Sequence, residues 1–127
     1  MRINLNSVLV DDQDKALTFY TEVLGFQKKV EIPVGAYRWL TVVSPEEPDG
    51  TQLVLEPNVN PAAKTYQEAL FDQGIALTAF EVSDIKGEHE RLHRLGVVFS
   101  MPPTNVGPAT IAVFEDTCGN RIQIYQL

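Results

Sequence analysis

The chain repeats one arrangement of apolar and turn residues, and this repeat restricts its possible folds more than any other feature. A β-like apolar run leads to Asp12 in the first half and to Asp84 in the second half, 72 residues later. A stretch with helical spacing of its apolar residues follows each aspartate and ends at a glycine, Gly25 or Gly96. A unit of about 70 residues is too long for a solenoid repeat, so the pattern predicts a duplicated supersecondary module.

Each half of the chain reads β-α-β-β-β, because three further β-like runs follow the helical stretch in both halves. The two halves should pack into one domain, since half of such a module cannot cover its own sheet. The expected fold class is α+β with eight main strands. The expected ranges are 1–56 for module 1, 57–74 for a connector with a short helix over 62–71, 75–127 for module 2, and 13–24 and 84–95 for the two main helices.

Composition and charge narrow the possible partners and the compartment. The 127 residues include 10 basic and 17 acidic side chains, which gives a net charge of −7. This balance argues against binding to nucleic acid or to anionic membranes, because both need clustered Lys and Arg. No apolar run approaches the roughly 18 residues of a membrane span, and the N-terminus lacks the apolar region of a signal peptide. With a single cysteine, Cys118, the chain fits a cytoplasmic location.

Alternation along the expected strands assigns the side chains to two faces of the sheet. One face is uniformly bulky and should pack under the helices; it comprises Val8, Val10, Leu40, Val42, Leu53, Leu55, Phe80, Val82, Ile111, Val113, Ile122 and Ile124. The other face mixes aromatic and polar groups, and its candidate ligand-binding residues are Trp39, Thr41, Glu56, Thr110, Phe114, Gln123 and Tyr125. Such a mixture suits a ligand pocket, although an ordinary half-exposed sheet face would look the same. Arg38 is a further candidate, either as a clamp for a carboxylate or phosphate or as a plain exposed strand arginine.

Short motifs in a fixed order carry a resemblance to a known family. They are Val-x-Asp at the end of the first strand, Phe19-Tyr20, Leu24-Gly25-Phe26, and Asp116 followed by Gly119-Asn120-Arg-Ile-Gln. This order resembles the vicinal oxygen chelate superfamily, which includes glyoxalase I, bleomycin-resistance proteins and extradiol dioxygenases. The resemblance implies two paired βαβββ modules whose mixed sheet curls into a cup around a small molecule, and it favours a homodimer.

The same resemblance identifies where metal-dependent members hold their metal. Carried over to this sequence, the two histidine positions fall on Leu5 and Leu77, and the two glutamate positions fall on Val54 and Gln123. Divalent metals need several converging nitrogen and oxygen donors, which these residues do not offer. We therefore expect no metal cofactor, with a site that uses Glu56 in a shifted register as the alternative.

A second motif resembles a zinc protease. His89 and His93, with Glu90 between them, spell H-E-x-x-H and would share one face of a helix. Gly96 continues the motif but already ends the second helix as Gly25 ends the first, and no third protein ligand is evident. Two histidines on a helix surface rich in Glu and Arg are the preferred interpretation.

Two functions of different classes remain open. The first is a binding protein that holds a small organic molecule without metal, and the acidic balance would suit a cationic ligand. The second is a glyoxalase-like lyase or isomerase, or a dioxygenase-type enzyme, that uses Glu56 as a general base or metal ligand.

Overall fold

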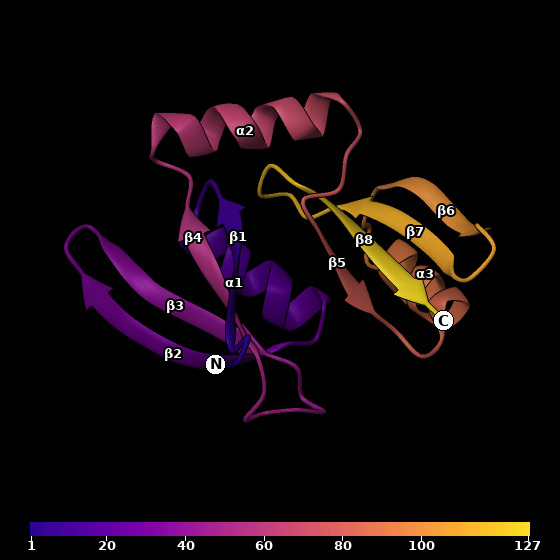
Figure 1. Cartoon of the computed structure of the whole chain (residues 1–127), viewed down its shortest axis with the longest axis horizontal. Helices are drawn as coiled ribbons and strands as arrows, with labels where there is room; N and C mark the ends of the chain where they lie inside the picture. Colours follow the sequence, from indigo (N-terminus) through magenta and orange to yellow (C-terminus); the bar gives the residue numbers. More distant parts are fainter. The chain divides into compact units, whose positions relative to one another are not determined.

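The computed structural model describes all 127 residues, and the chain forms two compact units, Met1–Thr65 and Tyr66–Leu127 (Figure 1). Unit 1 contains β1 (Leu5–Val10), α1 (Gln13–Thr18) continued by the π-helical turn η1 (Phe19–Val23), β2 (Gln27–Val34), β3 (Tyr37–Val43) and β4 (Gln52–Pro57). Unit 2 contains β5 (Thr78–Glu81), α3 (Ile85–Arg94), β6 (Phe99–Asn105), β7 (Thr110–Glu115) and β8 (Arg121–Gln126). The remaining helix, α2 (Pro61–Asp72), spans the boundary between the units.

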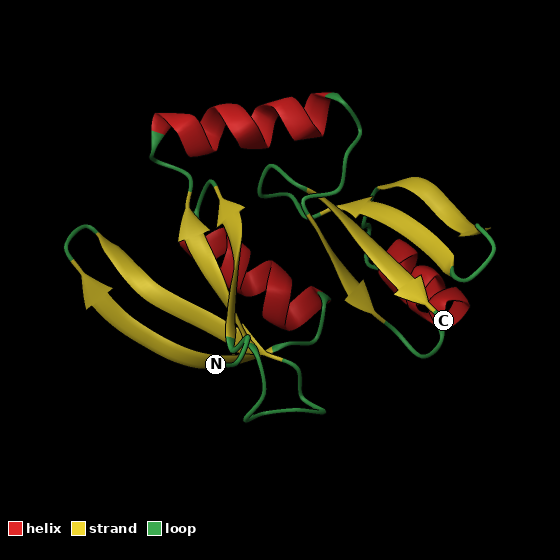
Figure 2. Ribbon diagram, in the orientation of Figure 1, coloured by secondary structure: helices red, strands yellow, loops and turns green.

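Both units have the same topology, which confirms the two predicted βαβββ modules and the α+β class. Each has a four-stranded mixed sheet, in the order β1-β4-β3-β2 in unit 1 and β5-β8-β7-β6 in unit 2. The first and last strands of each module pair in parallel, and the other neighbours pair antiparallel (Figure 2). That the two modules make a single domain stays a prediction.

The helices begin and end where the repeat predicts. Asp12 caps α1 by accepting a hydrogen bond from the Lys15 amide at 2.9 Å, and Asp84 caps α3 by accepting one from the Gly87 amide at 3.1 Å. Gly25 and Gly96 have φ values of 91° and 86°, a backbone conformation that favours glycine after a helix. These local signals fix where each strand is delivered after its helix.

In each unit the helix covers one face of the sheet, and we call the opposite side the distal face. The fully buried residues on the α1 side of unit 1 are Val8, Val10, Leu40, Val42 and Leu55, as predicted. On the α3 side of unit 2 the ring of His89 packs edge-on against Phe99, whose ring in turn contacts Phe114. None of the helices is both long and apolar enough to cross a membrane.

Candidate ligand-binding site

The distal face of unit 1 is defined by the register of its strands. Side chains directly opposite each other in neighbouring strands lie on the same face, so the partners Ser7, Thr41 and Val54 share a face, and Trp39 joins them two residues before Thr41. The strand residues on this face are Leu5, Ser7, Leu9, Gln27, Val30, Ile32, Val34, Tyr37, Trp39, Thr41, Val43, Gln52, Val54 and Glu56. Three of the four residues predicted for this unit therefore lie on one surface.

Trp39, Thr41 and Glu56 offer different chemistry on that surface. Trp39 keeps 41% of its surface exposed, so a flat face of the indole is accessible for stacking. Thr41 is buried, and its hydroxyl donates a hydrogen bond to Oε1 of Gln52 at 2.8 Å. Glu56 is exposed, forms no ion pair, and is the only acidic or basic side chain among the strand residues of this face. The face thus combines an aromatic surface with a single unneutralised negative charge.

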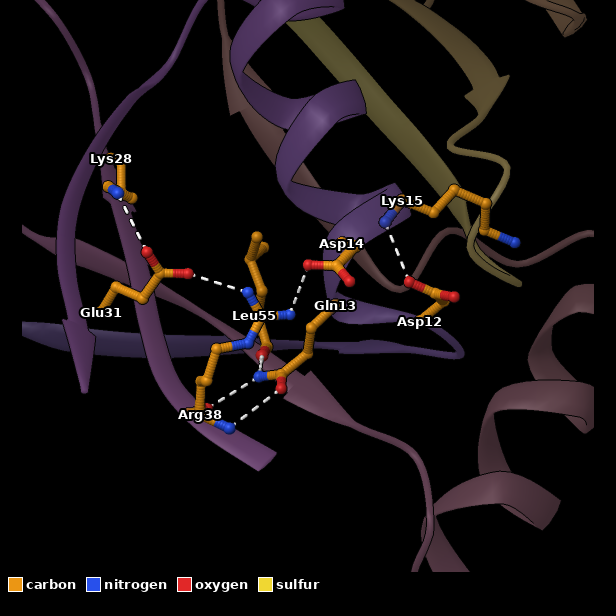
Figure 3. Close-up of polar contacts among 8 residues, drawn as sticks. All are labelled: Asp12, Gln13, Asp14, Lys15, Lys28, Glu31, Arg38 and Leu55. Carbon is orange, nitrogen blue, oxygen red and sulfur yellow. Dashed lines mark hydrogen bonds and ion pairs between the residues drawn. The ribbon is translucent and has the colours of Figure 1, made fainter. Parts of the chain in front are cut away.

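Arg38 does not belong to this face, and the prediction that it lines the site is wrong. Its guanidinium points to the α1 side, where Nη2 donates to Asp14 at 2.7 Å and Nη1 donates to Glu31 at 2.8 Å (Figure 3). The bond to Lys28 and then the bond to Arg38 lower the pKa of Glu31, while Asp14 and Glu31 raise the pKa of Arg38. Arg38 therefore ties α1 to β2 and is not available as a ligand clamp.

Gln13 has a role that the sequence did not indicate. Its side-chain amide lies between β3 and β4: Nε2 donates to the carbonyls of Arg38 at 2.7 Å and Leu55 at 2.9 Å, and Oε1 accepts from the Arg38 amide at 3.0 Å (Figure 3). The two strands are ladder partners only at Thr41–Val54 and Val42–Leu53. Beyond these rungs the Gln13 amide replaces the direct bonds between the strands, which diverge from each other in Figure 1.

The distal face of unit 2 holds only two of the four residues predicted for it. Gln123 is the partner of Ala79 and Val113, and Tyr125 is the partner of Glu81 and Ile111. Both lie on the distal face, as predicted.

Thr110 and Phe114, in contrast, are on the wrong face in the sequence prediction. Phe114 is the partner of Ile122, Thr110 is the partner of Gln126, and both pairs lie on the α3 side. The Phe114 ring is fully buried and lies 5.6 Å from that of Phe99. The cause is a slip of one residue in aligning the two halves, because a one-residue shift exchanges the faces of a strand.

The corrected alignment follows from the ladder partners. Thr41 pairs with Val54 in unit 1, and Val113 pairs with Gln123 in unit 2, so β3 and β7 correspond 72 residues apart. Ile111 and Val113, predicted to pack under the helix, take the distal positions. Because the segment Thr110–Glu115 is apolar on both faces for most of its length, alternation alone could not detect the slip.

The residues at the metal positions of the superfamily do not fit a metal. Val54 and Gln123 occupy equivalent distal positions, and Leu5 lies on the distal face of unit 1. Leucine and valine have no donor atoms, and a neutral amide is a weak ligand. No group of three or more His, Cys, Asp or Glu side chains could hold a metal ion.

The histidine pair also lies away from the distal face. The rings of His89 and His93 are 6.1 Å apart on α3, and His89 packs against Phe99 on the α3 side of the sheet. The H-E-x-x-H motif therefore takes no part in the candidate site.

Comparisons with known proteins place these features in a family. The family model described as Glyoxalase/Bleomycin resistance protein/Dioxygenase superfamily matches residues 2–124. The protein YurT of Bacillus subtilis is 56% identical over 126 residues, which are 99% of each chain. Among solved structures, UcmS2 superposes with a TM-score of 0.84 at 31% identity, covering 98% of this chain and 97% of that one. TnmS3, an antibiotic binding protein from Streptomyces sp. CB03234, superposes with a TM-score of 0.77 at 29% identity, covering 99% and 95%.

Proposed function

Because the chain belongs to the Glyoxalase/Bleomycin resistance protein/Dioxygenase superfamily, we propose that it binds a small organic molecule on its distal strand faces without using a metal ion. The observation that carries this proposal is the chemistry of the superfamily's ligand positions. Leu5, Leu77 and Val54 replace three donors with hydrocarbon side chains, and Gln123 replaces the fourth with an amide. Chemistry that polarises a substrate on a metal has no support from these residues.

The surface that remains has the composition of a binding site for an organic molecule. Trp39 offers an exposed indole for stacking, and Glu56 offers a charge that orients a ligand. In unit 2, Gln123 and Tyr125 offer an amide and a phenol on the distal face. TnmS3 is an antibiotic binding protein of the same fold, which supports a binding role for this chain as well.

A screen for bound molecules tests the proposal. Small planar organic compounds and divalent metals are added to the full chain, and a rise in its melting temperature reports binding. Stacking on an indole adds about 1 kcal/mol beyond area burial, so Trp39→Ala should weaken a bound planar compound by about tenfold or more. Trp39→Phe keeps an aromatic surface and should retain most of the affinity. A compound that binds equally well to all three chains would contradict the assignment of the site.

A lyase or isomerase that uses Glu56 as a general base is the second candidate function. It is favoured by one observation: the carboxylate is exposed on the distal face and has no ion-pair partner. In that case Glu56→Gln should lower turnover of a bound compound by about a hundredfold or more, while its affinity changes far less. Bound compounds that are recovered unchanged after prolonged incubation would leave the binding function alone.

A further inference from the structure

The two modules differ at one position that decides whether the sheet stays closed. Gln13 follows the capping residue Asp12, and Ile85 follows the capping residue Asp84, 72 residues later. Both side chains are buried, with 7% and 2% of their surface exposed. In unit 2 the β7–β8 ladder continues through every residue of β7, from Thr110 to Glu115. In unit 1 the matching ladder stops after two rungs, where the amide of Gln13 is inserted.

A buried amide at this position is not a requirement of the fold. Burying an amide costs free energy unless each of its polar atoms is hydrogen-bonded, and here it uses three bonds to the backbones of β3 and β4. Ile85 fills the equivalent place with hydrocarbon, and its sheet is continuous. The amide is therefore best explained by what it does, which is to hold β3 and β4 apart.

Trp39 and Glu56 lie on the two arms of the resulting fork. Trp39 precedes the last rung, Thr41–Val54, by two residues on β3, and Glu56 follows it by two residues on β4. Both are therefore on the distal face, at matching depth on opposite sides of the gap. A closed ladder would make them direct neighbours across the strands, whereas the fork leaves room between an indole and a carboxylate.

From this arrangement we propose that the fork is a recognition site for a planar organic cation, with Gln13 as the positioning residue. The inference rests on the proposed function and specifies its ligand class. Tryptophan is the side chain that best attracts a cation to its ring face, and Glu56 supplies the counter-charge. No Lys or Arg among the strand residues of the distal face competes for that carboxylate, and the net charge of −7 favours the approach of a cation.

Two planar probes of opposite charge test the charge selectivity. The cation is 9-aminoacridine and the anion is anthraquinone-2-sulfonate, each measured by equilibrium dialysis against the full chain. The wild-type chain should bind the cation more tightly. An exposed ion pair contributes up to about 1 kcal/mol, so Glu56→Gln should weaken the cation about fivefold and leave the anion no weaker. Glu46→Gln, which removes an exposed carboxylate from the loop before β4, is the matched control and should change neither affinity.

The role of Gln13 is tested by copying the other module. Gln13→Ile introduces the residue found at position 85, and Gln13→Met keeps the length of the side chain but removes its amide. Both should weaken the cation and change the emission and the acrylamide quenching of Trp39, which is the only tryptophan in the chain. Melting curves identify whichever variant is folded, and that variant decides the result. Loss of cation binding with an unchanged Trp39 signal would contradict a positioning role.

The outcomes separate this inference from the proposed function. If the anion binds as tightly as the cation, and Trp39→Ala weakens both while Glu56→Gln weakens neither, the chain is a binding protein but the assignment of an organic cation is wrong. If neither probe binds, and no other small molecule binds in a manner sensitive to Trp39→Ala, both are wrong. Cation binding that Glu56→Gln and a folded Gln13 variant both weaken would support the fork as the site.

Discussion

Replacing Phe114 with alanine should destabilise the chain strongly, because the register of β7 places this ring in the core of unit 2. The side chain is fully buried (0% exposed), and its ring lies 5.6 Å from that of Phe99. Removing a buried phenylalanine ring loses its transfer free energy and leaves a cavity, which together cost about 3–5 kcal/mol. In a chain of this size each kcal/mol lowers the melting temperature by roughly 4 °C, so the expected decrease is roughly 12–20 °C.

The measurement is urea unfolding followed by far-UV circular dichroism, with Trp39→Ala as the aromatic control. The Phe114→Ala chain should unfold at a lower urea concentration with an unchanged slope. Trp39 keeps 41% of its surface exposed, so its replacement should lose less than about half as much free energy. If Phe114→Ala unfolds at the wild-type urea concentration and instead loses ligand affinity, Phe114 lies on the distal face and the register given for β7 is incorrect.

Three further predictions concern pH, metal content and assembly. The pKa of Glu31 lies below its ordinary value of 4.5 because of Lys28 and Arg38, so its contribution to stability is complete above pH 4.5 and is lost as the pH falls through the lowered pKa. Glu31→Gln should therefore flatten the fall in stability on acidification, as measured by urea unfolding between pH 3 and 6; an unchanged curve would contradict the pairing. Elemental analysis should find no stoichiometric zinc, nickel, manganese or iron, and a stoichiometric metal that Glu56→Ala removes would overturn the metal-free proposal. We expect a homodimer in sedimentation at micromolar concentration, and a clean monomer would refute this.

The repeated local signals of the sequence were sufficient to predict the modules. An aspartate that caps each helix and a glycine that ends it are determined by neighbouring residues, and both features occupy the predicted positions at Asp12, Asp84, Gly25 and Gly96. Local hydrogen bonding and backbone conformation act within one turn of helix, so they can be inferred from short stretches of sequence. For the same reason the predicted helix boundaries agree closely with those of the structure.

The faces of the strands depend on longer-range pairing and were predicted less well. In β3 the alternation of polar and apolar residues was sufficient, and Trp39 and Thr41 lie on the predicted face. In β7 both faces are apolar, so only the pairing with β8 decides that Phe114 lies on the α3 side. Arg38 was misassigned for a related reason: its partner Asp14 is 24 residues away in the chain, and no local pattern indicates that ion pair.

Gln13 illustrates how a duplicated module can acquire one specialised half. The backbone plan is the same in both units, down to the capping aspartate that precedes the position in question. An isoleucine there is satisfied by packing alone, so the strands beyond it remain free to pair with each other. A glutamine of similar reach must find partners for its amide, and the nearest ones are the backbone groups of Arg38 and Leu55. Once these groups bond to the side chain they cannot bond across the sheet, so one substitution exchanges a closed ladder for a fork. Because the amide replaces the bonds that it interrupts, unit 1 gains an opening beside Trp39 without leaving a buried polar side-chain atom unsatisfied.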